Sequence, residues 1–132
     1  MWLVNLKNID MTQEEILKYN KLCADVMGWQ NLNDDSYPEY LTPMGDFYSL
    51  KNLMFDSDWN WIMMVIEKIE GLGFNTDSYS PIQGSVELED TLHQFNIWDK
   101  INPEIQGRAK TKKEATIQAI YKFLIWYNEN NK

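Results

Sequence analysis

Tryptophans and a short basic segment are the side chains of this sequence best suited to holding a ligand. The stretch "DWNWIMMVIEKIEGLGF" carries Trp59 and Trp61, and "FNIWDK" carries Trp98. Flat aromatic rings stack on nucleobases and other planar molecules. The segment "GRAKTKK" adds four cations, which are Arg108, Lys110, Lys112 and Lys113. Stacking rings and cations together would suit a nucleotide-like ligand.

Each of these features also has a simpler interpretation. Helical spacing places Trp61 with the apolar stripe that includes Ile62 and Val65, so it can be a core residue, while Trp59 lies nearer the helix end and stays open. The basic segment precedes the last expected helix, whose free N–H groups favour anions. The same cations can equally serve to keep a loop soluble. Both alternatives remain at this point.

No catalytic signature is present. His93 is the single histidine, and no motif supplies the orienting partner that a general base needs. The sequence lacks a phosphate-binding loop, a dinucleotide fingerprint, a nucleophile elbow and a His-Glu-x-x-His pattern. Three acidic groups lack the spacing of a calcium loop: Asp34-Asp35, Asp56-Asp58 and Glu87-Glu89-Asp90. We therefore expect a non-enzymatic protein without cofactor or metal, and a metal-dependent hydrolase is the least favoured class.

Composition limits the partners. The 132 residues fit one domain, 1–132, and the net charge of -8 disfavours nucleic acid as a partner because a phosphate backbone needs a positive face. An acidic surface would instead suit a basic protein. Cys23 is the single cysteine, which excludes an internal disulfide. No apolar run resembles a signal peptide or a membrane span, so we expect a cytoplasmic protein with no membrane partner.

Three helices are expected from their capping signals. Thr12 and Glu15 form a capping box for the first helix, which Gly28 ends. Ser57 or Asp58 caps the second, which Gly71 or Gly73 ends. Another box, "TKKE" at 111–114, begins a helix that runs almost to the last residue.

Short alternating runs separate the second and third helices. "FNTDSYS", "SVELED" and "HQFNIWDK" predict a meander of three antiparallel strands, with "NPEIQGRAKTKK" as a loop into the last helix. Residues 30–54 are expected to form an ordered irregular or lid-like segment. The fold class is α+β, a small antiparallel three- to four-stranded sheet packed with about three helices in an α/β/α-type sandwich, in the order α-α-β-β-β-α.

The last helix is apolar around most of its circumference. Ala115, Ala119 and Trp126 lie across from its main apolar face. Small residues beside a tryptophan favour close packing against a neighbouring helix or a second copy of the chain. A homodimer or higher homo-oligomer is therefore expected.

The order and spacing of three segments are similar to those of the phage ABA sandwich domain proteins, which are small and largely uncharacterised. The segments are "CADVMGWQ", "DWNWIMMVIEKIEGLGF" and "KTKKEATIQAIYKFLIWYNEN". The resemblance implies an α/β sandwich encoded by a phage or prophage, and it brings no catalytic residue. It further implies an accessory protein in the host cytoplasm. Such a protein would be a sponge for a nucleotide-derived immune signal or an acidic inhibitor of a host defence protein.

Overall fold

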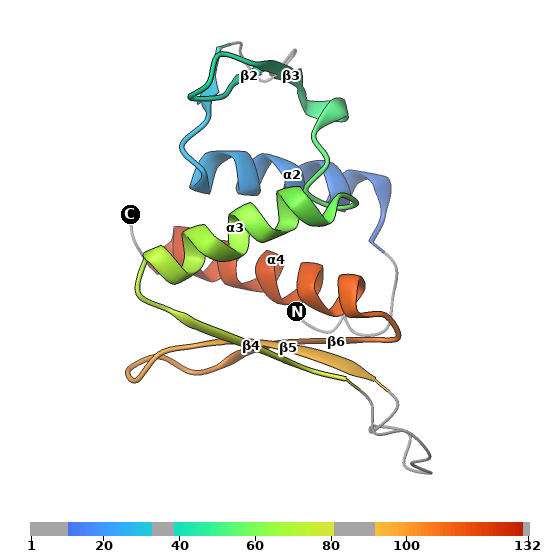
Figure 1. The fold of residues 1–132 in the computed structure, drawn as a ribbon, viewed down its shortest axis with the longest axis vertical. Helices are drawn as coiled ribbons and strands as arrows, with labels where there is room; N and C mark the ends of the chain where they lie inside the picture. The colour runs from blue at the N-terminus through green and yellow to red at the C-terminus, as the bar shows by residue number, and fades with distance from the viewer. Residues whose placement is uncertain (1–10, 33–38, 81–91, 131–132) are drawn as a thin grey trace. The chain divides into compact units, whose positions relative to one another are not determined.

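The computed structural model describes residues 11–32, 39–80 and 92–130, and these residues confirm an α+β fold (Figure 1). They form three α-helices and two antiparallel sheets of three strands each. The chain divides into two compact units, a first unit at Met11–Lys68 and a second unit that takes Ile69–Lys132. No helix of the described residues is long and apolar enough to cross a membrane. The expectation of a single domain stays a prediction.

Helix α2 (Gln13–Val26) begins in the first unit where the sequence predicts it. The hydroxyl of Thr12 accepts the N–H of Glu15 at 3.1 Å, and the Glu15 carboxylate accepts the N–H of Thr12 at 3.0 Å. This reciprocal pair satisfies two N–H groups that the helix leaves open. Beyond the other end, Gly28 has φ +78°, a conformation that side chains with a Cβ rarely adopt. The expected boundaries of this helix are confirmed.

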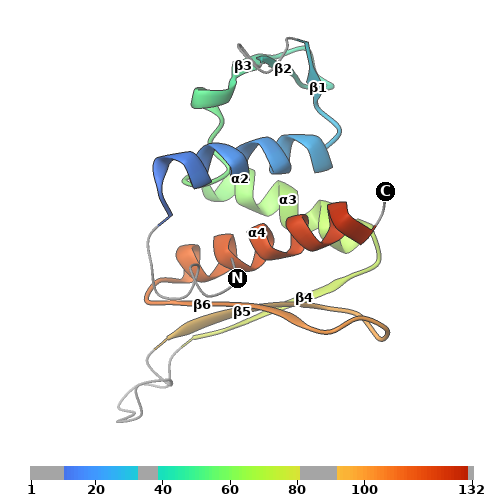
Figure 2. The same ribbon diagram turned by 180° about the vertical axis from the view of Figure 1, so that it is seen from behind.

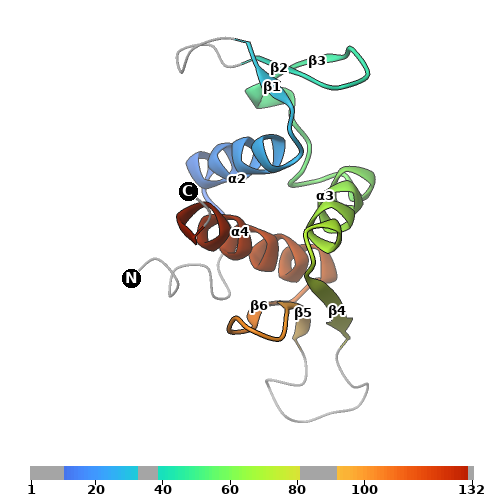
Figure 3. The same ribbon diagram turned by 90° about the vertical axis from the view of Figure 1, so that its left-hand side faces the viewer.

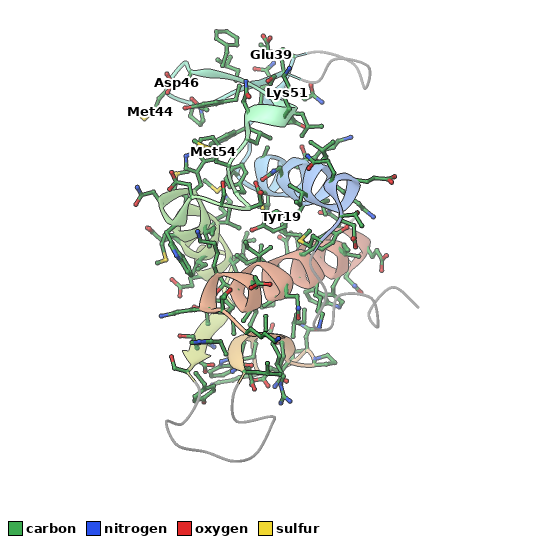
Figure 4. All side chains as sticks on the ribbon, turned by 90° about the vertical axis from the view of Figure 1, so that its right-hand side faces the viewer. Tyr19, Glu39, Met44, Asp46, Lys51 and Met54 are labelled. Carbon is green, nitrogen blue, oxygen red and sulfur yellow. The ribbon has the colours of Figure 1, made fainter. Side chains whose placement is uncertain are left out.

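A small sheet follows α2, where the sequence predicted an irregular segment. Strands β1 (Gln30–Asn31), β2 (Glu39–Leu41) and β3 (Phe47–Ser49) pair in chain order, and the short 3-10 helix η1 (Leu50–Asn52) follows (Figure 2). In the turn between β2 and β3, the Thr42 hydroxyl accepts the N–H of Asp46 at 3.1 Å. Met44 projects from this turn (Figure 4). The described residues 30–32 and 39–54 thus form paired strands and a short 3-10 helix, where an irregular segment was expected.

Helix α3 (Trp59–Gly71) begins after Asp58, one of the two residues expected to cap it. The Asp58 carboxylate accepts the N–H of Asn60 at 2.8 Å. Its apolar stripe is fully buried at Ile62 and Val65. Gly73 follows the helix with φ +104°, which gives the chain its exit toward the next strand.

The second unit is a sheet with one helix on it. Strands β4 (Asn75–Tyr79), β5 (His93–Trp98) and β6 (Ile105–Ala109) pair antiparallel in that order, and helix α4 (Lys112–Asn130) lies along one face (Figure 3). Phe95 and Ile97 are buried on this face. A Cβ on Gly107 would lie 2.0 Å from the carbonyl oxygen of Ala115 and 2.6 Å from the nitrogen of Ala119. The absence of a side chain at Gly107 therefore allows α4 to approach the sheet.

Strand β6 corrects two expectations. Ile105–Ala109 was predicted as part of a loop, but it is the third strand of the meander. The strand predicted at "SVELED" lies outside the described residues. The second correction concerns Ala115 and Ala119, which are buried and approach Gly107 of their own unit. Their small size is explained by this packing, so it no longer argues for a second copy of the chain.

The outer edge of β6 is hydrogen-bonded by side chains of α4. The side-chain oxygen of Gln118 accepts the N–H of Arg108 at 3.1 Å. The ammonium group of Lys122 donates to the carbonyl oxygen of Gln106 at 2.9 Å. Because residues two apart in a strand direct their backbone groups to the same side, both contacts lie on the side of β6 that does not pair with β5.

Candidate functional site

The face of the second sheet that turns away from α4 carries a set of polar and aromatic side chains, which we call the outer face. Successive residues of a strand point to opposite faces, and Gly107 marks the face toward α4. The pairing register then assigns eight residues to the outer face: Asn75, Asp77, Tyr79, Gln94, Asn96, Trp98, Gln106 and Arg108. In the described part of the second unit, α4 is the single helix and covers the opposite face (Figure 3).

Three rows cross this face. Asn75 lies opposite Trp98, and in the middle row Asn96 lies between Asp77 and Gln106. A further row, at the other end, runs across the sheet through Tyr79, Gln94 and Arg108. Directly opposite residues have side chains close enough to interact. Trp98 and Arg108, both chosen from the sequence as ligand-binding candidates, are thus brought onto one surface.

A hydrogen-bonded network fixes the middle of the outer face. Asn96 is only 2% exposed and donates to Oδ1 of Asp77 at 2.7 Å. The indole N–H of Trp98 donates to Oδ2 of the same carboxylate at 3.2 Å, and Gln94 donates to Oδ1 of Asn96 at 2.8 Å. Because every member is held by another, the network orients the Trp98 ring before any ligand arrives.

Two aromatic rings remain accessible at the ends of this network. Trp98 is 36% exposed and Tyr79 is 60% exposed. They belong to different strands and to the two end rows. Each ring has one polar end and one stacking surface, as is usual where proteins bind planar ligands.

Arg108 and Lys122 bring two positive charges to the β6 side. Burial first, and then the charge of Arg108, lower the pKa of Lys122 from its ordinary value of 10.5. In the described part of the chain, neither cation forms an ion pair with a carboxylate. Two cations that repel each other are stabilised when an anion binds between them, so this pair is suited to phosphate.

The other basic candidates lie elsewhere than expected. Arg108 was placed in a loop at the N-terminus of the last helix, but it is in β6 on the outer face. Lys110 and Lys112 are exposed between β6 and the first turn of α4, and Lys113 is half-buried. The Thr111 hydroxyl accepts the N–H of Glu114 at 3.1 Å, so a side-chain cap already occupies one of the N–H groups expected to bind an anion.

Trp59 and Trp61 belong to the first unit. Trp61 packs against three rings, with centroid distances of 4.9 Å to Phe55, 5.0 Å to Tyr48 and 5.4 Å to Trp29. These contacts fit the core interpretation of this residue. Trp59 is 37% exposed. Neither tryptophan belongs to the unit that contains the basic segment.

His93, Asp56 and Asp58 are the other titratable candidates from the sequence that lie in the described residues. His93 lies on the α4 side of β5, and its Nδ1 is buried without a hydrogen-bond partner among the described residues. Asp56 accepts from Asn20 at 3.0 Å, and Asp58 caps α3. The remaining acidic groups, Asp34-Asp35 and Glu87-Glu89-Asp90, lie outside the described residues. Within the described ranges, no group of three potential metal ligands is close enough to hold an ion.

Sequence reasoning did not select seven residues of this site: Asn75, Asp77, Tyr79, Gln94, Asn96, Gln106 and Lys122. The alternation in "NTDSY" and "HQFNIW" contains the signal for the strand residues, since it separates Asp77 and Tyr79 from Thr76 and Ser78. No comparable signal exists for Lys122, because its contact with Gln106 depends on how α4 lies on the sheet.

Comparisons with known proteins add no family assignment. No family model matches the chain, and no curated protein is similar to it. The resemblance to the phage ABA sandwich domain proteins therefore stays a prediction.

Proposed function

We propose that this protein is a non-enzymatic binding protein that takes up a nucleotide-derived small molecule on the outer face of its second sheet. The observation that carries the proposal is the joint position of Trp98 and Arg108 on one sheet face. Trp98 offers a stacking surface, and Arg108 with Lys122 offers two charges for phosphate.

The amides between these residues favour a base over a simple aromatic molecule. Counting partners among the described residues, Gln94 has its side-chain oxygen and one N–H left for a ligand after its bond to Asn96. An amide with a donor and an acceptor side by side can pair with the edge of a nucleobase. Asn96 itself is buried, so its role is to position Gln94 and Asp77.

The chemistry of the outer face supports binding without cleavage. Asp77 is the single carboxylate of the set, and both of its oxygens accept hydrogen bonds from neutral side chains. None of the eight residues is a serine, cysteine or histidine that could act as a nucleophile beside a base. We therefore expect the ligand to be released unchanged.

The resemblance to phage proteins supplies the biological setting of the proposal. A binder of this kind, made in the host cytoplasm during infection, would lower the concentration of a nucleotide-derived immune signal by sequestering it. Tight binding without turnover is what such a sponge requires, because the bound fraction depends on the amount and affinity of the protein.

An inhibitor of a basic host protein is the second candidate, and a surface of the first unit favours it. Three apolar side chains are exposed: Met54 (Figure 4), Trp59 and Met63. The chain carries a net charge of -8. Exposed apolar side chains within an acidic surface can anchor a cationic partner. The same side chains are the remaining argument for a homodimer or higher homo-oligomer.

Isothermal titration with adenine, guanine and uracil nucleotides tests the first candidate. The protein should bind at least one of them with micromolar or better affinity. Mass spectrometry of the ligand recovered after heat denaturation should find it intact. Recovery of a cleaved product would instead indicate that the protein is an enzyme. An absence of heat with every nucleotide, together with copurification of a host protein, would favour the inhibitor.

A further inference from the structure

We propose that the ligand of the outer face is a dinucleotide, with one base on Trp98, the other on Tyr79 and the phosphodiester on the cations of β6. This inference rests on the proposed function, since it specifies the ligand class of the same site. The observation that carries it is the position of two accessible rings in the two end rows of one sheet face, with Trp98 at one end of the hydrogen-bonded network and Tyr79 opposite Gln94 at the other.

The spacing of the rings suits two bases rather than one. Tyr79 lies opposite Gln94, and Gln94 is four residues from Trp98 along β5. Four residues of extended strand span about 13 Å, and adjacent strands are about 4.8 Å apart. One base cannot bridge that separation, whereas two bases joined through their sugars and a phosphate can reach both rings.

The cations occupy the position that the linking phosphate needs. Arg108 shares the row of Tyr79, two strands away, and Lys122 contacts Gln106 in the middle row. Arg108 therefore lies on the outer face and the ammonium group of Lys122 lies at the edge of β6, so both charges are on the β6 side of the two rings. A phosphodiester there would face Arg108 and Lys122, while its two bases would extend back over β5 and β4.

The charge on the Trp98 side argues against a longer nucleic-acid strand. Asp77 contacts the Trp98 indole, and the exposed Glu104 precedes β6 next to this end. A further phosphate beyond Trp98 would meet Glu104, and the net charge of -8 would repel a polyanion as a whole. The basic residues serve one phosphate group rather than a continuous backbone.

A comparison of four probes tests the inference. The dissociation constants of AMP, of the adenine dinucleotides in linear and 3′,5′-cyclic form, and of a ten-residue oligoadenylate are measured by titration. At least one dinucleotide should bind tenfold or more tightly than AMP, and the oligoadenylate should bind no more tightly than that dinucleotide.

Two alanine variants and one conservative control locate the second base. Tyr79→Ala and Trp98→Ala should each reduce the dinucleotide advantage over AMP from tenfold or more to about onefold, because stacking on one ring is lost. Tyr79→Phe keeps the ring and should keep the advantage. Circular dichroism checks the fold, and the greater exposure of Tyr79 makes its variant informative even where Trp98→Ala fails to fold.

The outcomes separate this inference from the proposed function. If AMP and both dinucleotides bind equally well, the dinucleotide assignment is wrong and the nucleotide-binding proposal survives. If the oligoadenylate binds tenfold more tightly than either dinucleotide, the ligand is a nucleic-acid strand. If no probe binds, and the guanine and uracil nucleotides also give no heat, the nucleotide-binding proposal itself fails.

Discussion

The indole N–H of Trp98 and Oδ2 of Asp77 lie 3.2 Å apart across the β4–β5 pair, and Oδ1 of the same carboxylate accepts from buried Asn96 at 2.7 Å. Asp77 therefore holds a binding residue with one oxygen and a structural residue with the other. Its position links the stability of the sheet to the orientation of the exposed ring.

Replacement of Asp77 should reduce stability. Asp77→Ala leaves the side-chain N–H of Asn96 without its partner in a buried position, at a cost of about 1–3 kcal/mol. Urea denaturation followed by far-UV circular dichroism measures the difference. Ser78→Ala is the control, because Ser78 is the next residue in β4 and its side chain is exposed. This substitution should change stability by less than about 0.5 kcal/mol. Equal stability of Asp77→Ala and the wild type would show that the network contributes nothing.

Trp98 and Trp59 form a matched pair of variants, because their exposed fractions are 36% and 37%. Trp98→Ala should weaken binding of the ligand identified by titration about 5- to 150-fold, corresponding to one lost stacking contact of about 1–3 kcal/mol. Trp59→Ala should leave the dissociation constant unchanged, since that residue belongs to the first unit. The reverse result would move the site from the outer face to α3.

Ligand affinity should depend on pH through Lys122. Burial and Arg108 lower the pKa of Lys122 in the free protein, and a bound phosphate opposes that effect by favouring the charged form. Affinity is therefore highest below the lowered pKa of Lys122 in the free protein. It falls as the pH rises through the higher pKa that Lys122 has in the complex. Titrations from neutral pH to about 10.5 should detect this loss. Lys122→Met should bind more weakly at neutral pH and lack this pH dependence.

Gly107→Ala should be the most damaging single-methyl substitution in the second unit. The added Cβ would lie 2.0 Å from the backbone oxygen of Ala115, and backbone atoms of a helix cannot rotate away. A loss of about 1–3 kcal/mol, or a failure to fold, is expected in thermal denaturation. Gly71→Ala is the control, because nothing lies within 4 Å of its added Cβ and its φ is ordinary. It should be neutral or slightly stabilising.

The thiol of Cys23 should react very slowly in the native protein. Its thiol is fully buried in α2, and burial raises its pKa well above the ordinary value. Since the thiolate is the reactive form, reaction with Ellman's reagent at pH 8 should be on the order of 1000-fold slower than in urea. Rapid labelling of the folded protein would mean that α2 opens readily.

Local sequence signals predicted the helix boundaries because caps act over three or four residues. Thr12 and Glu15 form both hydrogen bonds of the predicted capping box, and the Thr111 hydroxyl accepts the N–H of Glu114 as its spacing predicts. Strand β6 was missed for the opposite reason. Its inward positions include Gly107 and Ala109, whose small size reflects the approach of α4 and gives no apolar alternation to read.

The candidate site was predictable only in part. Trp98 and Arg108 were selected by residue type, whereas their common face depends on the register of β4, β5 and β6. A shift of one residue in that register would have turned one of them toward α4. The pairing of Lys122 with Gln106 depends in addition on the packing of the helix, which no local pattern encodes.

The contacts of Gln118 and Lys122 with β6 also bear on how this protein behaves at high concentration. An open strand edge is a template on which another chain can add by backbone pairing, which is a common route to aggregation. Here the N–H of Arg108 and the carbonyl of Gln106 are already bonded, and an approaching strand would meet the half-buried ammonium group of Lys122. Lys122 thus hinders the addition of another strand to β6. Its replacement would lower the solubility of the protein as well as its affinity for the ligand.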